Sequence, residues 1–459
     1  MIFSSSTPEI PSSEPFKNDL LNREQYADIL TSLIDTSEKG FIMSINATWG
    51  YGKTTFIRMW EQKLKNFGYP TVYINAWEKD FIDDPFAVIM ATIWEQTQKQ
   101  DAYIKKPSEV LKTLGDIAGK IIAHRYIGEA ALDVIKKGVG NDLQTPYALN
   151  QYIQQVENVK QFKEQLSTYV QQLKSQDGSA KDKLIIFVDE LDRCRPDYAI
   201  EMLERIKHLF SIDNVVFVLS VDQFVLQESI KGFYGSSNIS ADNYLRRFID
   251  IEYRLPEPSI DNFIDFQIQY HKLDQYITEH TPHPMFSHEN IDYSSQFPLM
   301  VKVLFQTISC SLRNIEKYFN RLEYVIRTLK LDMGAFFVSV FLTYIYIFRK
   351  DIYCELKEYR YLDSELLYAI ENLLFDSKVD LESNYGQLAI GIMTELVQIY
   401  RTAIESQHIE NDTRLTDLSQ YTSTYINNVN SKNVFRNNYK PRLPLVKYIN
   451  KIEMTEAIR

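Results

Sequence analysis

Apolar residues in the first 255 positions gather in short continuous runs, and segments with helical spacing lie between them. The runs are "GFIMSINA" at 40–47, "YPTVYINAWE" with a strand near 70–76, "LIIFVDE" at 184–190 and "NVVFVLSVD" at 214–222. Helices are predicted at 19–37, at 53–65, after the acidic "DDPF" and at about 197–210. Strands that are apolar throughout are typical of a parallel sheet with helices on both faces. The pattern therefore predicts an α/β fold.

The pattern changes after "RLPEPS" at 254–259, where the strands stop and helical spacing takes over. Clustered Ser, Pro and Glu predict a flexible tail at 1–17. An α/β domain is expected at 18–255, with a charged helical insertion at about 103–176. A helical lid at 256–330 and a helical C-terminal domain at 331–459 complete the predicted organisation.

The longest uncharged apolar run is "MGAFFVSVFLTYIYIF" at 333–348. It is shorter than the roughly 20 residues that a membrane-spanning helix needs, and charged residues bound it. A buried core helix is the favoured interpretation and a membrane-associated helix is the alternative. No transmembrane segment or secretory signal is predicted.

Charge and cysteine content narrow the class of protein. The chain of 459 residues has a formal net charge of -11, and a field of this sign repels DNA and anionic membranes. Its 3 cysteines, Cys194, Cys310 and Cys354, are widely spaced and odd in number, which argues against a disulfide framework. We expect a reducing, cytoplasmic setting.

The segment "ATWGYGKTTF" at 47–56 joins the first predicted strand to a helix and follows the phosphate-loop pattern, except that Ala47 replaces its first glycine. Backbone N–H groups there would point at phosphates, and Gly50 and Gly52 would allow close approach. Lys53 would contact the β- and γ-phosphates, and the Thr54 hydroxyl would reach Mg²⁺. The plainer alternative is an ordinary strand–turn–helix.

A buried strand that ends in two acids strengthens the nucleotide hypothesis. At the end of "LIIFVDE", Asp189 is placed to bind Mg²⁺ and Glu190 to polarise the attacking water. The next strand ends near Ser220 and Asp222, which either sense the γ-phosphate or cap the following helix. Together these motifs predict a site for ATP and Mg²⁺.

Several further segments make the chain resemble the KAP family of P-loop NTPases, within the AAA-like and STAND type of signalling ATPases. They are "DLLNREQYADIL", "ATWGYGKTTF", "VYINAWEKD", "IIFVDELDRC", "NVVFVLSVDQ", "YLRRFIDIEYRLPEP" and "SLRNIEKYFNRL". The resemblance implies ATP hydrolysis coupled to conformational change or assembly. It implies nucleotide contacts along the loop, including Trp49, Tyr51 and Thr55, and an adenine pocket lined by the segment with Asn22 and Arg23. Because 103–176 is polar, the chain resembles a soluble member.

The resemblance also singles out three arginines as catalytic candidates. Arg246 and Arg247 are candidates to approach phosphate, in cis or as an arginine finger across a subunit boundary, with surface pairing to acids as the alternative. Arg313 matches the place of a second sensor arginine, with pairing to Glu316 as the alternative.

Two clusters near the end of the chain carry less signal. From 418 to 452 the chain has no acid but contains Lys432, Arg436, Lys440, Arg442, Lys447 and Lys451. A contact with the protein's own acidic face is the favoured interpretation, with nucleic acid or an acidic partner as alternatives. His280, His283 and His288 indicate a loop rather than a zinc site, because no fourth ligand is evident.

The sequence thus predicts an ATPase switch that controls assembly or activation of a protein partner, as a homo-oligomer. The family resemblance favours anti-phage defence, with a separate effector. A nucleotide-gated scaffold with little turnover and a nucleic-acid-dependent ATPase are the alternatives.

Overall fold

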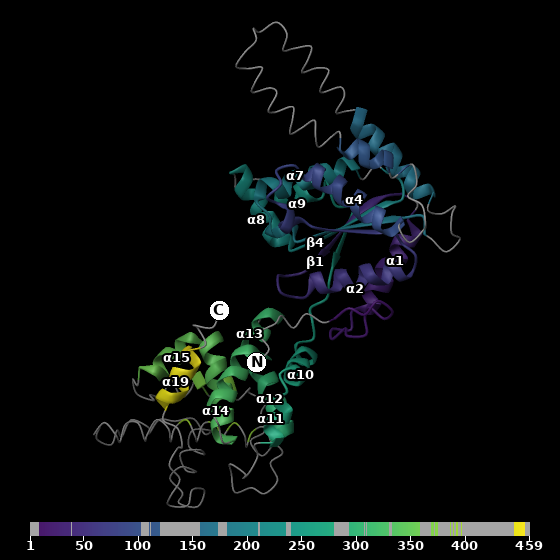
Figure 1. Cartoon of the computed structure of the whole chain (residues 1–459). Coiled ribbons are helices and arrows are strands. Elements are labelled where there is room, and N and C mark those ends of the chain that lie inside the picture. Colours follow the sequence, from purple (N-terminus) through teal and green to yellow (C-terminus); the bar gives the residue numbers. More distant parts are fainter. Residues whose placement is uncertain are drawn as a thin grey trace, which may run out of the picture. The chain divides into compact units, whose positions relative to one another are not determined.

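The computed structural model describes residues 9–37, 39–101, 110, 112–119, 157–172, 181–209, 212–235, 240–279, 293–306, 308, 310–329, 333–358 and 445–454, with isolated positions between 369 and 396. The chain divides into two compact units, and the boundary falls between Glu257 and Pro258. The first is an α/β unit and the second is helical (Figure 1).

Five parallel strands form the sheet of the α/β unit, in the order β2-β3-β4-β1-β5. They are β1 (Phe41–Asn46), β2 (Thr71–Asn75), β3 (Leu184–Asp189), β4 (Val215–Val221) and β5 (Ile251–Arg254). The first four agree with the predicted apolar runs. The sequence did not predict β5, a short edge strand whose residues alternate between half-buried and exposed.

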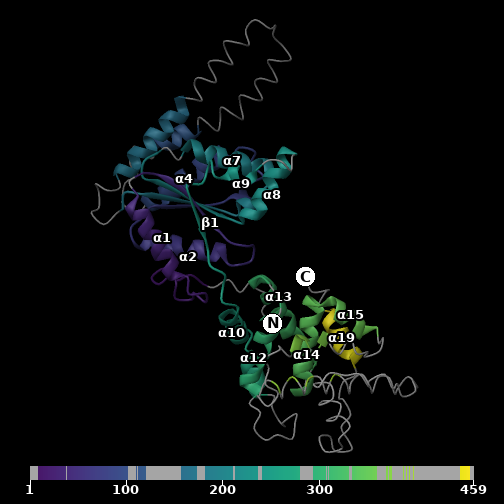
Figure 2. The same ribbon diagram turned by 180° about the vertical axis from the view of Figure 1, so that it is seen from behind.

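Helices cover both faces of the sheet, as predicted. Helices α1 (Glu24–Thr36) and α2 (Lys53–Asn66) lie on one face (Figure 2). The other face carries α4 (Pro85–Asp101), α7 (Pro196–Leu209), α8 (Gln223–Tyr234) and α9 (Ala241–Leu245). Successive β4 residues alternate between the two cores: Phe217 packs with the α7 side and Val218 with the α2 side. Burial of both sets explains why the strand is apolar throughout.

The N-terminal segment differs from the predicted flexible tail within the described residues 9–17. Phe16 is buried in the core beside α2, and its ring meets Phe56 edge-on. Helix α1 starts at Glu24, within the predicted segment 19–37, and the preceding Asn22 has a positive φ of 51°. The Asp19 carboxylate accepts hydrogen bonds from the backbone N–H groups of Leu21, Arg23 and Glu24, and so caps the helix from a distance.

The described part of the second unit consists of helices around an aromatic core. Its helices are α10 (Ile260–Tyr270), α11 (Leu273–Glu279), α12 (Tyr293–Gln306), α13 (Leu312–Leu329), α14 (Met333–Phe348), α15 (Lys350–Lys357) and α19 (Leu445–Met454). The apolar run at 333–348 is α14, which packs on α13: Tyr318 donates to the Val340 carbonyl. The predicted boundary at residue 330 therefore falls between two helices of one compact unit. Among the described helices, none is long and apolar enough to cross a membrane.

Some predicted features lie partly or wholly outside the described residues. The three histidines at 280, 283 and 288 and the basic residues from 432 to 442 are among them. Of the predicted insertion at about 103–176, the structure describes helical residues at 110, 112–119 and 157–172. Cys194, Cys310 and Cys354 are all free thiols, as the spacing predicts.

Candidate functional site

The loop between β1 and α2 has the backbone that close approach to an anion requires. Gly50 and Gly52 have φ of 83° and 77°, a region open mainly to glycine. Ala47 is not among the described residues with positive φ, so the structure needs no glycine there. Its N–H donates to the Val221 carbonyl at 3.3 Å. No side chain caps the N-terminus of α2, and its first turn has no acidic residue, which suits an anion.

Lys53 begins α2 and turns back toward the loop. Its Nζ donates to the Ala47 carbonyl at 2.5 Å, and the residue is only 9% exposed. Burial lowers the pKa of Lys53, while the nearby carboxylates of Asp192, Asp222 and Asp189 oppose that shift. A buried ammonium group beside a glycine-containing loop at the start of a helix is a suitable partner for phosphate. Thr54, the next residue, is exposed.

Asp189 is the last residue of β3 and is held by two hydrogen bonds. It is 1% exposed, and its carboxylate accepts from the Tyr73 hydroxyl and from the Glu190 N–H, both at 2.9 Å. Burial, together with the neighbouring Asp189, raises the pKa of Tyr73, so this hydroxyl stays a donor. Asp189 is therefore an ionisable carboxylate with a fixed orientation.

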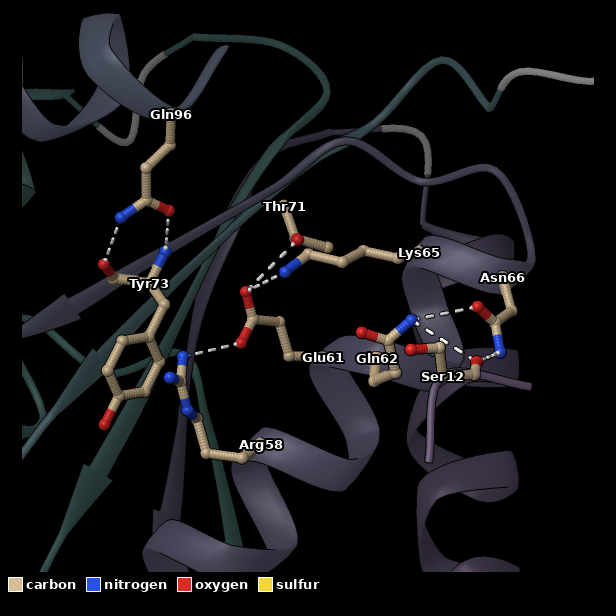
Figure 3. A network of polar contacts seen from close by, with 9 residues as sticks. All are labelled: Ser12, Arg58, Glu61, Gln62, Lys65, Asn66, Thr71, Tyr73 and Gln96. Carbon is tan, nitrogen blue, oxygen red and sulfur yellow. Dashed lines mark hydrogen bonds and ion pairs between the residues drawn. The ribbon is translucent and has the colours of Figure 1, made fainter. Parts of the chain in front are cut away.

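A polar network between α2 and the edge strand β2 supports Tyr73 (Figure 3). The Gln96 side chain pairs with both the N–H and the carbonyl of Tyr73, at 2.8 and 2.7 Å, and so completes the open edge of the strand. The Arg58 guanidinium lies 4.0 Å from the centroid of the Tyr73 ring and pairs with the buried Glu61 at 3.0 Å. These contacts fix the strand that positions Asp189.

Glu190 follows directly and adopts a left-handed conformation with φ of 61°. Its carboxylate pairs with Arg193 at 2.8 Å and hydrogen-bonds to the Asn75 side chain. The pKa of Glu190 is raised overall, mainly by burial and also by the nearby Asp189 and Asp192, while the Arg193 and Asn75 contacts oppose the shift. A general base for water must be ionised, and these two donors favour that form.

Ser220 and Asp222 lie at the end of β4, next to the loop. Asp222 caps α8, as one of the two predicted alternatives has it, accepting from the Val225 N–H at 3.5 Å. It also accepts from the Trp49 N–H at 2.9 Å and so anchors the loop. Ser220 is fully buried and aligns with Asp189 across β3 and β4. Its Oγ has no hydrogen-bond partner among the residues that the structure describes.

Arg23 connects the loop with the end of the α/β unit. It is 3% exposed, and its guanidinium donates to the Gly52 carbonyl at 3.2 Å and to the Pro256 carbonyl at 3.5 Å. Burial lowers the pKa of Arg23 to about 10. The preceding Asn22 is exposed. The predicted adenine segment therefore contains a residue that contacts the phosphate loop.

Two of the remaining predicted arginines belong to the α/β unit and one to the helical unit. Arg246 and Arg247 are exposed and precede β5, and Arg246 pairs with Asp242 at 2.8 Å. Since β5 runs parallel to β1, both arginines precede the amino-terminal end of β5, whereas the loop follows the carboxyl-terminal end of β1. Arg313 is exposed in the first turn of α13, in the helical unit.

The parallel sheet, with a glycine loop and a lysine after one strand and acids after another, defines the class of P-loop NTPases. The model of the KAP family P-loop domain matches residues 23–329, well over half of the chain. The chain therefore belongs to the KAP family, which implies nucleotide binding.

Solved structures give only a distant likeness. The Aeropyrum pernix ORC2 protein in its ADP form is 13% identical, with 99% of this chain and 97% of that chain covered and a TM-score of 0.35. Drosophila ORC bound to DNA is 12% identical, with coverages of 96% and 88% and a TM-score of 0.34. C. elegans PCH-2 is 11% identical, with coverages of 74% and 69% and a TM-score of 0.30. A search of curated proteins found no match.

Several residues at this edge were not assigned a role from the sequence. Asp192 is 9% exposed beside Lys53, and burial raises its pKa while Lys53 lowers it. Tyr73, Asn75 and Arg193 each contact one of the two acids. All four belong to the quoted "VYINAWEKD" and "IIFVDELDRC" segments, whose density of polar residues at and after buried strands was the available signal.

The loop geometry leads to a prediction for Gly52→Ala. A Cβ at positive φ costs about 1–2 kcal/mol, so we expect a lower free energy of unfolding by that amount, with weaker nucleotide binding. Gly232→Ala is the matched control, because Gly232 lies inside α8 where an added Cβ meets no atom within 4 Å. We expect it to stabilise by about 0.5–1 kcal/mol. Urea unfolding of both variants measures the difference, and equal stabilities would contradict the prediction.

Proposed function

We propose that the chain binds ATP with Mg²⁺ beside the phosphate loop, at the carboxyl-terminal end of the strands. The chain would hydrolyse ATP and use the cycle as a conformational switch. The observation that carries this proposal is that Lys53, in the first turn of α2, lies close enough to Asp189 for their charges to interact, with Glu190 directly after Asp189. Lys53 would hold the β- and γ-phosphates, and the loop N–H groups would surround them. Glu190 would take the proton of the attacking water.

The donor set at this edge fits Mg²⁺. The Asp189 carboxylate and the Thr54 hydroxyl are hard oxygen donors, and Mg²⁺ is usually held by one or two carboxylates together with substrate phosphates. Bound with ATP, Mg²⁺ would offset the charge of the phosphates. Tyr73 would keep the Asp189 carboxylate oriented through its 2.9 Å hydrogen bond.

The switch part of the proposal rests on Arg23. This buried guanidinium contacts both the Gly52 carbonyl in the loop and the Pro256 carbonyl, two residues before the helical unit begins. A change in the loop on nucleotide binding would alter the Gly52 contact and bias the chain near Pro256. The controlled event would be assembly with further copies or with a protein partner.

Hydrogen exchange tests the switch. The chain with Glu190→Gln and ATP would represent the state before hydrolysis, and the wild-type chain with ADP the state after it. We expect exchange around Arg23 and residues 254–279 to differ between the two states. Identical exchange and identical sedimentation would favour the alternative, a scaffold in which nucleotide only stabilises the fold.

Two arginine roles would belong to an assembled form. Arg246 and Arg247 precede the amino-terminal end of β5, whereas this chain's own loop follows the carboxyl-terminal end of the parallel strand β1. A phosphate contact by either arginine would therefore come from a second copy. Arg313 would contribute from the helical unit as a sensor of the γ-phosphate. Loss of turnover in Arg247→Ala at concentrations where copies associate, with unchanged ATP binding, would support the first role.

The biological setting is a further part of the proposal. The resemblance to the KAP family favours anti-phage defence through a separate effector. Cells that carry Lys53→Ala should then lose protection in a plaque assay, and equal protection would contradict the idea. Nucleic acid is a possible partner of residues 418–452, where the described helix α19 presents an exposed Lys447. DNA-stimulated turnover that is lost without 418–459 would support it.

A further inference from the structure

Arg193 occupies a defined place between two tryptophans. Its guanidinium lies 5.2 Å from the centroid of the Trp49 ring and 5.6 Å from that of the Trp77 ring. Trp49 belongs to the phosphate loop after β1, and Trp77 to the short helix α3 (Ala76–Lys79) after β2. Arg193 itself ends the 3₁₀ turn Leu191–Arg193 after β3. One guanidinium thus joins the segments that follow three different strands.

The same guanidinium holds the carboxylate of Glu190. The Arg193 Nη1 to Glu190 Oε1 distance is 2.8 Å, and the two side chains are 28% and 13% exposed. Such a pair is more strongly coupled than one in full contact with solvent. The two cation–π contacts restrict the rotamers of Arg193 and so favour one direction of the pair.

Glu190 needs such support because of its backbone. A non-glycine residue at φ of 61° is in a sparsely populated region and persists only where surrounding contacts hold it. Asn75 supplies one contact, and the side chain of Asn75 is itself engaged by the Glu78 N–H at 3.3 Å. Arg193 supplies the only ion pair recorded for Glu190 among the described residues.

We propose that Arg193 is a positioning residue for the proposed hydrolysis: clamped between Trp49 and Trp77, it fixes the carboxylate of Glu190 toward the phosphate loop. The inference rests on the proposed function, because it assigns a partner to the residue that would act as base. Since Trp49 is part of the loop, the clamp also ties the orientation of Glu190 to the loop that would hold the phosphates.

Turnover and ATP affinity of Arg193→Gln and Arg193→Lys test this inference. We expect kcat to fall on the order of tenfold or more in Arg193→Gln, with KM and the Kd for ATP within about threefold of wild type. Arg193→Lys keeps the charge but not the planar guanidinium with its several donors, and should recover part of kcat. Trp77→Ala should lower kcat by a smaller factor in the same direction, roughly 2–5-fold.

Arg195→Gln is the matched control. Arg195 lies two residues further, is exposed and pairs with Asp83 at 3.0 Å, so the same change of charge there should leave kcat unaltered. A double variant separates positioning from a structural effect: in the Glu190→Gln background, Arg193→Gln should not lower the residual turnover further. An additive loss would overturn the inference.

The outcomes distinguish this inference from the proposed function. If the wild-type chain hydrolyses ATP and Arg193→Gln matches it or is faster, only the positioning role is overturned, and a faster variant would show that the pair restrains Glu190. If the wild-type chain binds ATP without turnover, the proposed hydrolysis fails, and the positioning role fails with it.

Discussion

Lys53→Ala should weaken ATP binding on the order of 100-fold. A charge-assisted contact to phosphate is worth about 1.5–3 kcal/mol, and each 1.4 kcal/mol or so is a factor of ten in Kd. Lys53 is buried, and its Nζ donates a hydrogen bond to the carbonyl of Ala47, the first residue of the loop. Among the described residues, no other lysine takes part in the contacts given above for the phosphate loop and its neighbouring acids. Isothermal titration with ATP and Mg²⁺ measures the change.

Lys39→Ala is the control for the loss of positive charge. Lys39 is exposed and lies before the amino-terminal end of β1, whereas the loop follows the carboxyl-terminal end of that strand. It should bind ATP as the wild-type chain does. Equal affinity in Lys53→Ala and the wild type would mean that the loop at 47–54 is an ordinary strand–turn–helix connection, the plainer interpretation of its sequence.

Glu190→Gln should separate binding from hydrolysis. Removing a general base typically costs 10²–10⁴ in rate, and glutamine is nearly the same size, so the fold and the loop should be preserved. The Arg193 contact at 2.8 Å would become a neutral hydrogen bond. We expect ATP to remain bound while phosphate release falls by about 100-fold or more.

Glu228→Gln makes the same chemical change on the surface of α8. Glu228 is exposed and pairs with Lys231, and its substitution should leave turnover unchanged. Wild-type rates in Glu190→Gln would mean that another group accepts the proton. Asp192, buried beside Lys53, would then be the next candidate.

The central strands were predictable because both of their faces are buried. Every residue of β4 is buried, and so is every residue of β3, which leaves a continuous apolar run in the sequence. Strand β5 has four residues with alternating exposure and gives no such run. The exact start of α1 is set by the left-handed Asn22, which interrupts a segment whose apolar spacing is helical throughout.

The loop and the two acids could be predicted because their chemistry is local in sequence. The supporting contacts could not, since they depend on how strands lie side by side. Tyr73 reaches Asp189 because β2 and β3 are neighbours in register, and nothing in the sequence fixes that order. Ala47 can replace the first glycine of the pattern because its backbone needs no positive φ.

The most direct test counts bound nucleotide and released phosphate in one sample of the wild-type chain with saturating ATP and Mg²⁺. We predict about one nucleotide per chain and continuing release of phosphate beyond one per chain, as expected of a P-loop ATPase with Lys53 and Glu190 in place. A chain that retains no nucleotide would contradict the site, and one that retains ATP without releasing phosphate would contradict the role of Glu190.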